Sequence, residues 1–362
     1  MVLTRVSLAQ NLDNIGLAMK SVYEQNSFVL YLEIELDANS SRLYNYEFDF
    51  RSQSGLVERP LEYQDSIYQG SKKDQHYFKY IFNDAEVGEE IKVILVNKSD
   101  GLTFTYTHSK DETHPVLLFD KKGLPILNYW TNPGDFLLSA DSVFGFYYAT
   151  DFGVALPPMT TKETAPATQI QIDSSFIVNK KIELKKPGLY LFQKDTSEMK
   201  AIAIRVEPFY FPRFTTIEEL VGPLIYLSDI EEQDQLEKIG NDKKLFDKFW
   251  LKMAENPERA KKIIRGYYDR VEYVNSNFTT FKEGWKTDMG MIYLVMGPPH
   301  SIEKSGNKEV WNYQDGRHLP KRRYQFIKTS TLFSPAHYVL IRERKHAESW
   351  FKAVNLIRNG IF

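Results

Sequence analysis

Hydrophobic and polar positions alternate through much of the chain up to residue 206, which is the period-two pattern of β-strands. The clearest run is 28–37, where leucine or isoleucine recurs at every second position from Leu30 to Leu36. This run predicts a half-buried strand. A second alternating run, 43–50, follows the turn-forming residues 39–41, so the two runs together predict a hairpin.

Further short runs of the same kind are bounded by turn residues, and such spacing is typical of antiparallel sandwiches. They lie at 75–82, 90–96, 102–107, 115–119, 144–148, 168–172, 176–184, 189–194 and 201–206. Residues 157–168 are rich in proline and threonine and predict an exposed, mobile loop, with a domain linker as the alternative. Residues 1–27 are weakly amphipathic and predict a short helix or an irregular lead-in.

Helical signals begin after residue 211. Thr216 and Glu219 have the spacing of a capping box, and apolar residues over 245–253 mark one face of a second helix. Asn256 before Pro257 is the start signal of a third helix. The end of the chain predicts short strands at 310–313, 324–327 and 337–341 and a closing helix at 348–357.

These patterns predict a multidomain protein, because 362 residues exceed one ordinary core. The first half is expected to be mainly β, with a β-sandwich-like module at 1–121 and a second β-rich module at 122–208. An α+β domain, helices first and then a small antiparallel sheet, is expected at 209–362.

The stretch 281–300 joins the predicted helices to the predicted strands. Gly284 can take a positive φ that a branched residue cannot. Trp285 is expected to be a core anchor, with surface recognition as the alternative. Thr287 and Asp288 carry short oxygen acceptors that suit a hydrogen-bonded turn.

Residues 291–296, Met-Ile-Tyr-Leu-Val-Met, predict a strand after that turn. Gly297, Pro298 and Pro299 are expected to end it, because consecutive prolines cannot donate to a ladder. His300 is the best single candidate for acid–base chemistry, since imidazole titrates near neutrality. A solvated turn histidine is the alternative.

Composition narrows the classes of function. A formal charge of −2 argues against a nucleic-acid partner. The absence of cysteine excludes disulfides, thiolate metal sites and cysteine nucleophiles, and it leans mildly towards an envelope protein. Seven scattered histidines and the lack of phosphate-loop, dinucleotide and nucleophile-elbow motifs predict no metal, no cofactor and no assignable catalytic residue.

Nothing at the start of the chain has the pattern of a signal peptide, and no apolar run approaches the roughly 20 residues of a membrane span. One interpretation of Met1 is that a targeting segment has been removed before it. A basic cluster near the C-terminus is the candidate partner-binding surface, with a solvated hairpin loop as the alternative. It consists of Arg317, Lys321, Arg322 and Arg323.

Gly284-Trp-Lys-Thr-Asp288 resembles the pattern that names the GWxTD-domain family, and 297–299 follow at the family's spacing. Trp311 and Tyr313 resemble its tryptophan–tyrosine strand, and 323–327 its aromatic strand. Such proteins occur mainly in Bacteroidota, often behind a lipoprotein signal, and the family has no established reaction. The resemblance implies a periplasmic or outer-membrane setting, with membrane attachment through a lipid anchor.

The function predicted is that of a non-enzymatic accessory or scaffold subunit, bound to an outer-membrane assembly, secretion or transport complex. One alternative is an enzyme acting on envelope glycan or peptide, with His300 and Asp288 in one cleft. Another is a carbohydrate-binding module, which requires exposed coplanar aromatic rings on one sheet face. Burial of Asp288 against backbone amides favours a structural clamp over catalysis.

Overall fold

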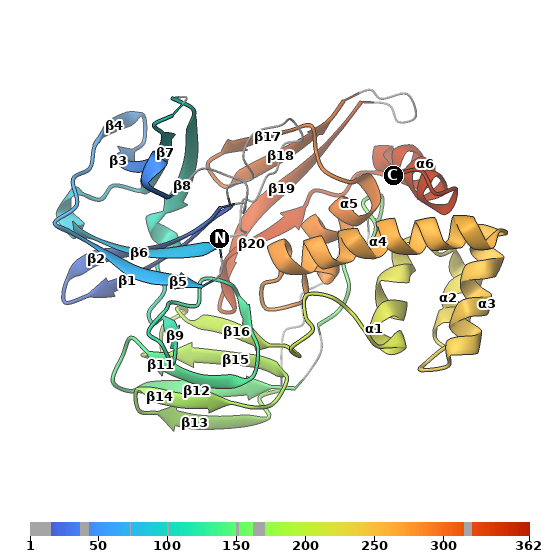
Figure 1. The fold of residues 1–362 in the computed structure, drawn as a ribbon, viewed down its shortest axis with the longest axis horizontal. Coiled ribbons are helices and arrows are strands. Elements are labelled where there is room, and N and C mark those ends of the chain that lie inside the picture. Colours follow the sequence, from blue (N-terminus) through green and yellow to red (C-terminus); the bar gives the residue numbers. More distant parts are fainter. Residues whose placement is uncertain are drawn as a thin grey trace. The chain divides into compact units, whose positions relative to one another are not determined.

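The computed structural model describes residues 16–36, 43–72, 74–99, 101–149, 152–161, 171–314 and 321–362. As predicted, the first half is mainly β, with several antiparallel sheets, and helices followed by a small antiparallel sheet make up the C-terminal part (Figure 1). None of the described helices is both long and apolar enough to cross a membrane.

The chain forms two compact units, and each draws on separated stretches of sequence. The first unit comprises Met1–Thr150, Gln171–Glu207 and Ser330–His337, and the second comprises Asp151–Ile170, Pro208–Thr329 and Tyr338–Phe362. The finer division at residues 121/122 and 208/209 stays a prediction.

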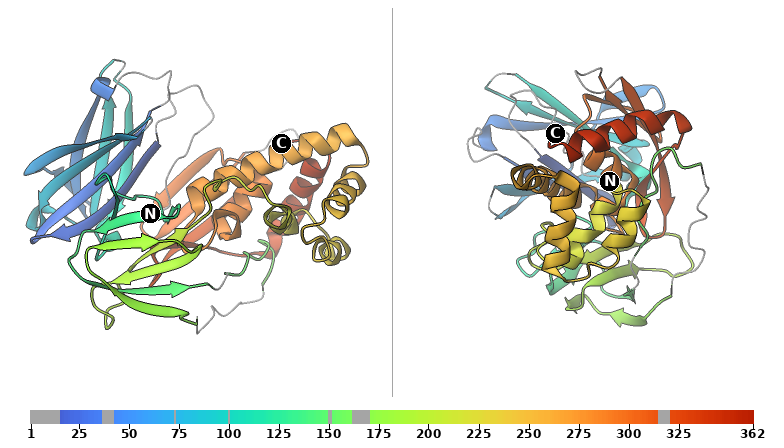
Figure 2. Two further views of the ribbon diagram at one scale, coloured as in Figure 1. Left: turned by 60° about the horizontal axis from the view of Figure 1, so that its bottom comes forward. Right: turned by 90° about the vertical axis from the view of Figure 1, so that its right-hand side faces the viewer.

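The first unit begins with two four-stranded sheets that face each other across one apolar core (Figure 2). One sheet has the order β1 (Gly16–Glu24), β2 (Ser27–Glu35), β6 (Gln75–Asn83), β5 (Asp65–Lys72). The other has the order β4 (Val57–Pro60), β3 (Tyr46–Ser54), β7 (Glu90–Asn97), β8 (Thr103–Ser109).

The sequence predicted a strand at 28–37 that is buried on one face only. Strand β2 is instead buried on both faces. Leu30 and Leu32 point into the core between the two sheets, whereas Val29 and Tyr31 join the core of the second β section. The predicted hairpin is also wrong, because β2 pairs with β1 and β6 while β3 pairs with β4 and β7.

Strand β1 corrects the expectation of a helix or an irregular lead-in at 1–27, as far as the described residues reach. Its positions from Leu17 to Val22 are all buried, so apolar residues do not alternate with polar ones. Lys20 and Ser21 interrupt the apolar run. A strand covered on both faces carries no period-two signal.

The second β section has a five-stranded sheet and a three-stranded one. The five-stranded sheet has the order β10 (Trp130–Thr131), β16 (Ile202–Val206), β15 (Gly188–Gln193), β12 (Val143–Tyr148), β13 (Ser174–Val178). The three-stranded sheet has the order β14 (Lys181–Leu184), β11 (Gly134–Leu138), β9 (Leu118–Asp120). The single strand predicted at 176–184 is two strands in different sheets, separated at Lys180, whose φ is 63°. Of the strand predicted at 168–172, residues 168–170 lie outside the described residues and 171–172 are not in a strand.

The second unit follows the predicted helix signals closely. Its helices are α1 (Ile217–Val221), a 3₁₀ turn (Gly222–Tyr226), α2 (Ile230–Leu236), α3 (Lys243–Ala254), α4 (Pro257–Phe278), α5 (Asp288–Met296) and α6 (Ala347–Arg358). The capping box of Thr216 and Glu219 is present in both directions, and Asn256 caps α4 with Pro257 in its first turn.

The strands at the end of the chain form one sheet in sequence order. They are β17 (Ser301–Ser305), β18 (Lys308–Tyr313), β19 (Arg322–Thr331) and β20 (Ser334–Leu340). Strand β17 was not predicted, whereas the other three overlap the predicted strands. Helices α4 and α5 lead directly into this sheet, so the stretch 281–300 lies where helices give way to strands, as the sequence indicates.

Candidate functional site

The last turn of α4 holds the backbone of the stretch that follows it. Asn275, which is fully buried, accepts a hydrogen bond at Oδ1 from the Trp285 amide at 3.2 Å. Thr279 accepts at Oγ1 from the Gly284 amide at 2.9 Å and donates to the Asn275 carbonyl at 2.6 Å. Two backbone donors of the turn are therefore satisfied inside the protein, as burial requires.

Gly284 is required by close approach and not by backbone conformation. Its φ is not in the positive region, so the conformational freedom noted in the sequence is not used here. A Cβ atom at this position would lie 1.8 Å from the carbonyl oxygen of Val274. Gly290 in α5 is just as constrained, since its Cβ would lie 1.9 Å from the Gly284 carbonyl oxygen. The two glycines let helix α4, the turn and helix α5 touch at backbone distance.

Trp285 is buried, with 5% of its surface exposed. Its indole N–H donates to Glu283 Oε2 at 3.1 Å, and its ring meets the Tyr226 ring edge-on at 6.3 Å. The Tyr226 hydroxyl donates to the Trp285 carbonyl at 3.2 Å. Gly222 leaves room for the ring, because a Cβ there would lie 2.9 Å from it. Trp285 therefore packs as a core residue.

Thr287 starts a helix where the sequence pattern predicted a strand. Its hydroxyl accepts from the Gly290 amide at 3.0 Å, which makes it the N-cap of α5, and it donates to the Gly284 carbonyl at 2.8 Å. The strand expected at 291–296 is wrong, because these residues form the body of α5. Their apolar run shows no period because α5 is buried on nearly all sides.

Asp288 occupies the first turn of α5 and is 7% exposed. Its Oδ2 accepts from the Leu340 amide at 2.7 Å and from Arg342 Nη1 at 3.1 Å, and its Oδ1 accepts from Arg342 Nη2 at 2.5 Å. This is the two-pronged geometry of a strong arginine–carboxylate pair. The positive end of the α5 dipole also favours the carboxylate.

Comparison with protein-family models assigns this part of the chain to a family. Residues 188–359 match the family model described as GWxTD domain. The chain carries a GWxTD domain. No curated protein matches the chain. The five residues of the pattern thus form a turn and the start of helix α5. Gly284 allows close packing and Trp285 lies in the core. Thr287 caps α5 and Asp288 binds Arg342.

The turn after α5 of the GWxTD domain is fixed by two distant side chains. Gly297 ends the helix with a φ of 76°, the left-handed conformation that glycine takes without strain. Arg270 of α4 donates to the Leu294 carbonyl at 2.9 Å and so binds the open end of α5. The Tyr313 hydroxyl donates to the Gly297 carbonyl at 3.0 Å.

Beyond that turn, Pro298 is exposed and Pro299 is buried, while His300 is exposed. Trp311, with 2% of its surface exposed, donates to Glu309 Oε1 at 2.8 Å and packs against the rings of Phe278 and Phe326. Most of the motif residues named from the sequence therefore lie in the interior of the GWxTD domain.

An extended segment of the same unit packs beside Asp288. Arg342 donates from Nη2 to the Leu156 carbonyl at 3.1 Å, so one guanidinium binds both the motif carboxylate and this segment. Lys282 donates to the Gly153 carbonyl at 3.3 Å. Burial lowers the pKa of Lys282 to about 8, and the nearby Asp288 carboxylate opposes that shift. Pro158 is buried, so the described part of the predicted mobile loop, 157–161, is packed at that point.

The basic cluster is only partly described. Arg317 lies outside the described residues, and Lys321 is exposed. Arg323 pairs with Glu303 at 3.3 Å, and Arg322 lies 3.7 Å from Glu348. Two of its charges thus have acidic neighbours within the domain, which weakens the cluster as an anionic-ligand site.

Sequence reasoning missed the residues that complete the site. These residues are Leu340 and Arg342, which contact Asp288 from 52 and 54 positions away along the chain, and Asn275, which contacts Trp285 from 10 positions away. None belongs to a recognisable pattern. One signal was available in the sequence: Asp288 stands beside an apolar stretch, and a carboxylate that is buried with such a stretch needs a buried hydrogen-bond donor.

A second polar group was missed in the first unit. Ser21 Oγ lies 2.8 Å from His108 Nε2, and Glu112 Oε2 lies 3.7 Å from His108 Nδ1. This is the order of a serine–histidine–carboxylate triad, but all three side chains are buried. Ser21 is also 2.9 Å from the Thr113 hydroxyl. We interpret the group as a structural network inside the β unit.

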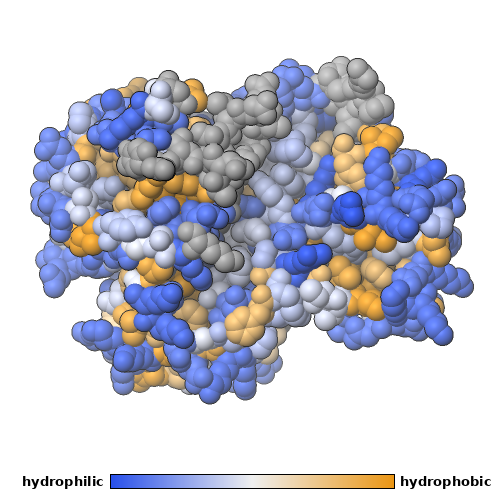
Figure 3. All heavy atoms as spheres, viewed as in Figure 1, coloured by the Kyte–Doolittle hydropathy of each residue, from blue (hydrophilic) through white to orange (hydrophobic). Residues whose placement is uncertain are grey.

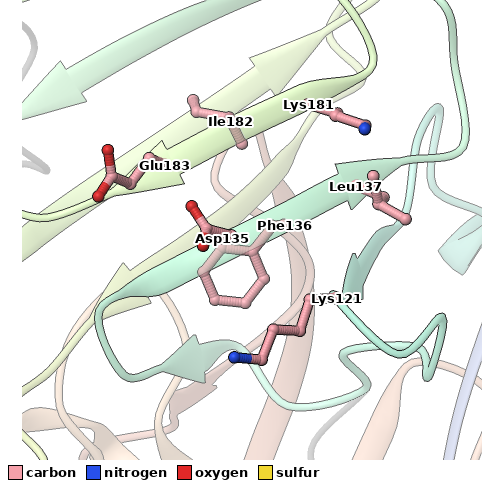
Figure 4. A pocket seen from close by; sticks show the side chains of 7 residues that line it. All are labelled: Lys121, Asp135, Phe136, Leu137, Lys181, Ile182 and Glu183. Atoms are coloured by element: carbon pink, nitrogen blue, oxygen red, sulfur yellow. The ribbon is translucent and has the colours of Figure 1, made fainter.

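The surface pocket drawn in Figure 4 belongs to the first unit and has a volume of about 450 Å³. Its lining side chains come from β11, β14 and the turn after β9. They are Lys121, Asp135, Phe136, Leu137, Lys181, Ile182 and Glu183. Asp135 and Glu183 are directly opposite in the strand register, and the described residues contain no group of three or more potential metal ligands.

Proposed function

We propose that the protein is a non-catalytic accessory or scaffold subunit, bound through protein contacts to an outer-membrane assembly, secretion or transport complex. The observation that carries the proposal is the state of Asp288. Both of its oxygens are engaged by the Leu340 amide and the Arg342 guanidinium. The most reactive group of the motif is therefore used to hold the domain together.

The other polar motif groups support the same conclusion. The Thr287 hydroxyl donates to one backbone group and accepts from another, and the Trp285 indole N–H is bound to Glu283. Groups that already satisfy one another inside a fold stabilise it and do not need a substrate for their hydrogen bonds. The motif that defines the family thus has a sufficient structural explanation.

Location at the periplasmic face of the outer membrane, with attachment through a lipid anchor, is part of this proposal. It rests on the membership of residues 188–359 in the GWxTD domain family and on the envelope setting which that family implies. The lack of cysteine leans mildly in the same direction, because a cytosolic protein of this length more often carries a few thiols.

Contact surfaces for a partner are available on both units. On the face drawn in Figure 3, hydrophobic residues lie in small groups among hydrophilic ones. Leu56 and Val57 at the β3–β4 turn are 103% and 68% exposed, and Phe351 on α6 is 60% exposed. Lys321, which is exposed, supplies a basic contact. Large exposed apolar side chains of this kind suit a binding role.

The two alternatives gain less from the geometry. An enzyme that uses Asp288 with His300 needs a free carboxylate, whereas Asp288 is bound on both oxygens. A carbohydrate-binding sheet needs coplanar exposed rings. The exposed Tyr68 is inclined by 57° to the half-buried Phe78, and the exposed Tyr63 by 68° to the buried Tyr80, so both rings pack against aromatic side chains of the sheet itself.

The test is purification of the full-length tagged protein from its native envelope in mild detergent, followed by mass spectrometry. We expect a stoichiometric outer-membrane partner that is retained through a second column. A matched chain with Leu56→Asp and Val57→Asp tests whether the β3–β4 turn is the contact. Recovery of the protein alone, from intact membranes and in several detergents, would contradict the proposal.

A further inference from the structure

Residues 152–157 of the second unit belong to no helix or strand, and a turn follows at 158–159. Three carbonyls of residues 152–158 are bound by groups of the GWxTD domain. Gly153 accepts from Lys282 at 3.3 Å, and Leu156 accepts from Arg342 Nη2 at 3.1 Å. Pro158 accepts from the Glu343 amide at 3.0 Å. Recognition through backbone carbonyls depends on backbone shape more than on side-chain identity.

Two of the three bound carbonyls are three residues apart, and the third, that of Pro158, lies two residues further on. The carbonyls bound by cationic side chains are those of Gly153 and Leu156, three residues apart. The buried side chains are Ala155 and Pro158, also three apart. A polyproline II helix has three residues per turn and no internal hydrogen bonds, so it presents one carbonyl row and one side-chain row in this way. The sequence Leu156-Pro-Pro158 favours that conformation.

The receiving surface is preorganised by the motif. Asp288 holds the Arg342 guanidinium at 2.5 Å and is itself fixed by the Leu340 amide. One aromatic side chain of this surface, Phe281, contacts the segment: its ring meets that of Phe152 edge-on at 5.0 Å. Aromatic side chains beside fixed donors are the usual equipment of sites that bind proline-rich segments.

We propose that the surface formed by Phe281, Lys282, Glu343 and the Asp288–Arg342 pair is a binding site for extended, proline-containing protein segments, which residues 152–158 occupy in cis. Asp288 is a positioning residue in this site, because it acts through Arg342. The ligand class is a polyproline II segment with a small residue followed three positions later by proline. A preformed segment of this kind loses little entropy on binding.

This inference goes beyond the function proposed above and does not depend on it. Peptide binding is measured with the purified chain alone, whereas the envelope role is measured by recovery of a partner. Either result can therefore be positive while the other is negative.

The test uses the full-length chain with Ala155→Glu and Pro158→Gly, which weaken the occupant and leave the receiving surface unchanged. The probe is a fluorescent peptide with the sequence of residues 152–161. We expect saturable binding at least tenfold tighter than to the unaltered chain, in which residues 152–158 compete. Lys282→Met added to the double variant should weaken binding severalfold, and a peptide with glutamate at the position of Ala155 should not bind.

Hydrogen exchange on the unaltered chain gives a second readout if the double variant does not fold. Saturating free peptide should speed exchange of the Val154, Ala155 and Leu156 amides at least tenfold while the α4 amides keep their protection. Equal peptide binding to the unaltered and double-variant chains would overturn the proposal. So would unchanged exchange of the three amides with no detectable binding.

Discussion

Two cationic side chains hold remote segments of the chain, one in each unit. Lys20 is buried and has no carboxylate partner among the described residues, whereas Arg342 is half-buried, with 19% of its side chain exposed, and is paired with a carboxylate. In the second unit Arg342 binds the Leu156 carbonyl while paired with the Asp288 carboxylate. In the first unit Lys20, only 1% exposed, donates to the carbonyls of Ile126 at 3.2 Å and Asn128 at 2.9 Å.

The surroundings of Lys20 make the difference plain. Its Nζ lies 4.4 Å from the centre of the Tyr129 ring, and burial lowers its pKa to about 7. The nearby His114 is also buried, and burial lowers its pKa well below the usual value. The comparison teaches that a buried carboxylate paired with a half-buried guanidinium should be destabilised by removal of either member. A buried cation held only by carbonyls and a ring lowers the stability of the fold through its desolvation, so its replacement by an apolar side chain should remove that penalty.

Trp285→Ala has the largest expected effect and sharpens the comparison, because it acts on the second unit alone. Loss of the buried indole should lower the free energy of unfolding of that unit by roughly 3–5 kcal/mol. Urea unfolding followed by circular dichroism measures it. Phe351→Ala, which removes a 60% exposed ring, is the control and should stay within about 0.5 kcal/mol. An unchanged midpoint for Trp285→Ala would place the indole outside the core.

Asp288→Asn comes next and tests the balanced pair directly. It leaves the Arg342 guanidinium without its negative partner. Because that guanidinium is half-buried, the cost should be up to about 3 kcal/mol, the lower end of the range for a fully buried pair. The same urea titration measures the change. Asp234→Asn, an exposed isosteric change in α2, should lie within about 0.5 kcal/mol. If both variants unfold at the wild-type midpoint, the pair contributes nothing to stability.

Lys20→Met is the opposite case and the way to break the comparison. The folded-state pKa of about 7 lies below the unfolded value of about 10.4. Between these pH values the unfolded state binds more protons, so stability should rise with pH, by at most about 1.4 kcal/mol per pH unit. The Lys20→Met variant should lose this increase of stability with pH. At pH 7 its free energy of unfolding should be no lower than that of the unaltered chain.

Denaturant titrations of both chains at pH 7, 8 and 9 isolate this contribution, because other titrating groups are common to the two chains. A variant that is several kcal/mol less stable at every pH, with the slope unchanged, would contradict the account. Lys20 would then contribute as a bound cation and not as a buried cost.

His300→Ala has the smallest expected effect. The side chain is exposed, so the free energy of unfolding should change by less than about 0.5 kcal/mol. Thermal unfolding checks it. A large loss would mean that the turn after Pro299 depends on the imidazole in a way that the geometry does not indicate.

The sequence predicted what local chemistry determines. The capping box at Thr216, the Asn256–Pro257 helix start and the α+β order of the C-terminal unit follow from nearest neighbours along the chain. Trp285 was predicted to be buried because no other side chain of the stretch offers as much apolar surface. These signals need no knowledge of distant residues.

What long-range packing determines was not predictable. The run 291–296 forms a helix because the Thr287 cap and burial on nearly all sides override its strand-like composition. Strand β1 was missed because it is covered on both faces. The choice of Arg342 as the partner of Asp288 depends on a contact across 54 positions of chain, for which a single sequence gives no spacing rule.

The central claim is that the buried GWxTD aspartate has a structural role as the partner of the half-buried Arg342 guanidinium. A double-mutant cycle with Asp288→Asn, Arg342→Met and the combined variant measures it most directly, by urea unfolding of the second unit. We predict a coupling free energy of about 2 kcal/mol, near the upper part of the range for residues in direct contact. Effects that add to within about 0.5 kcal/mol would contradict the claim.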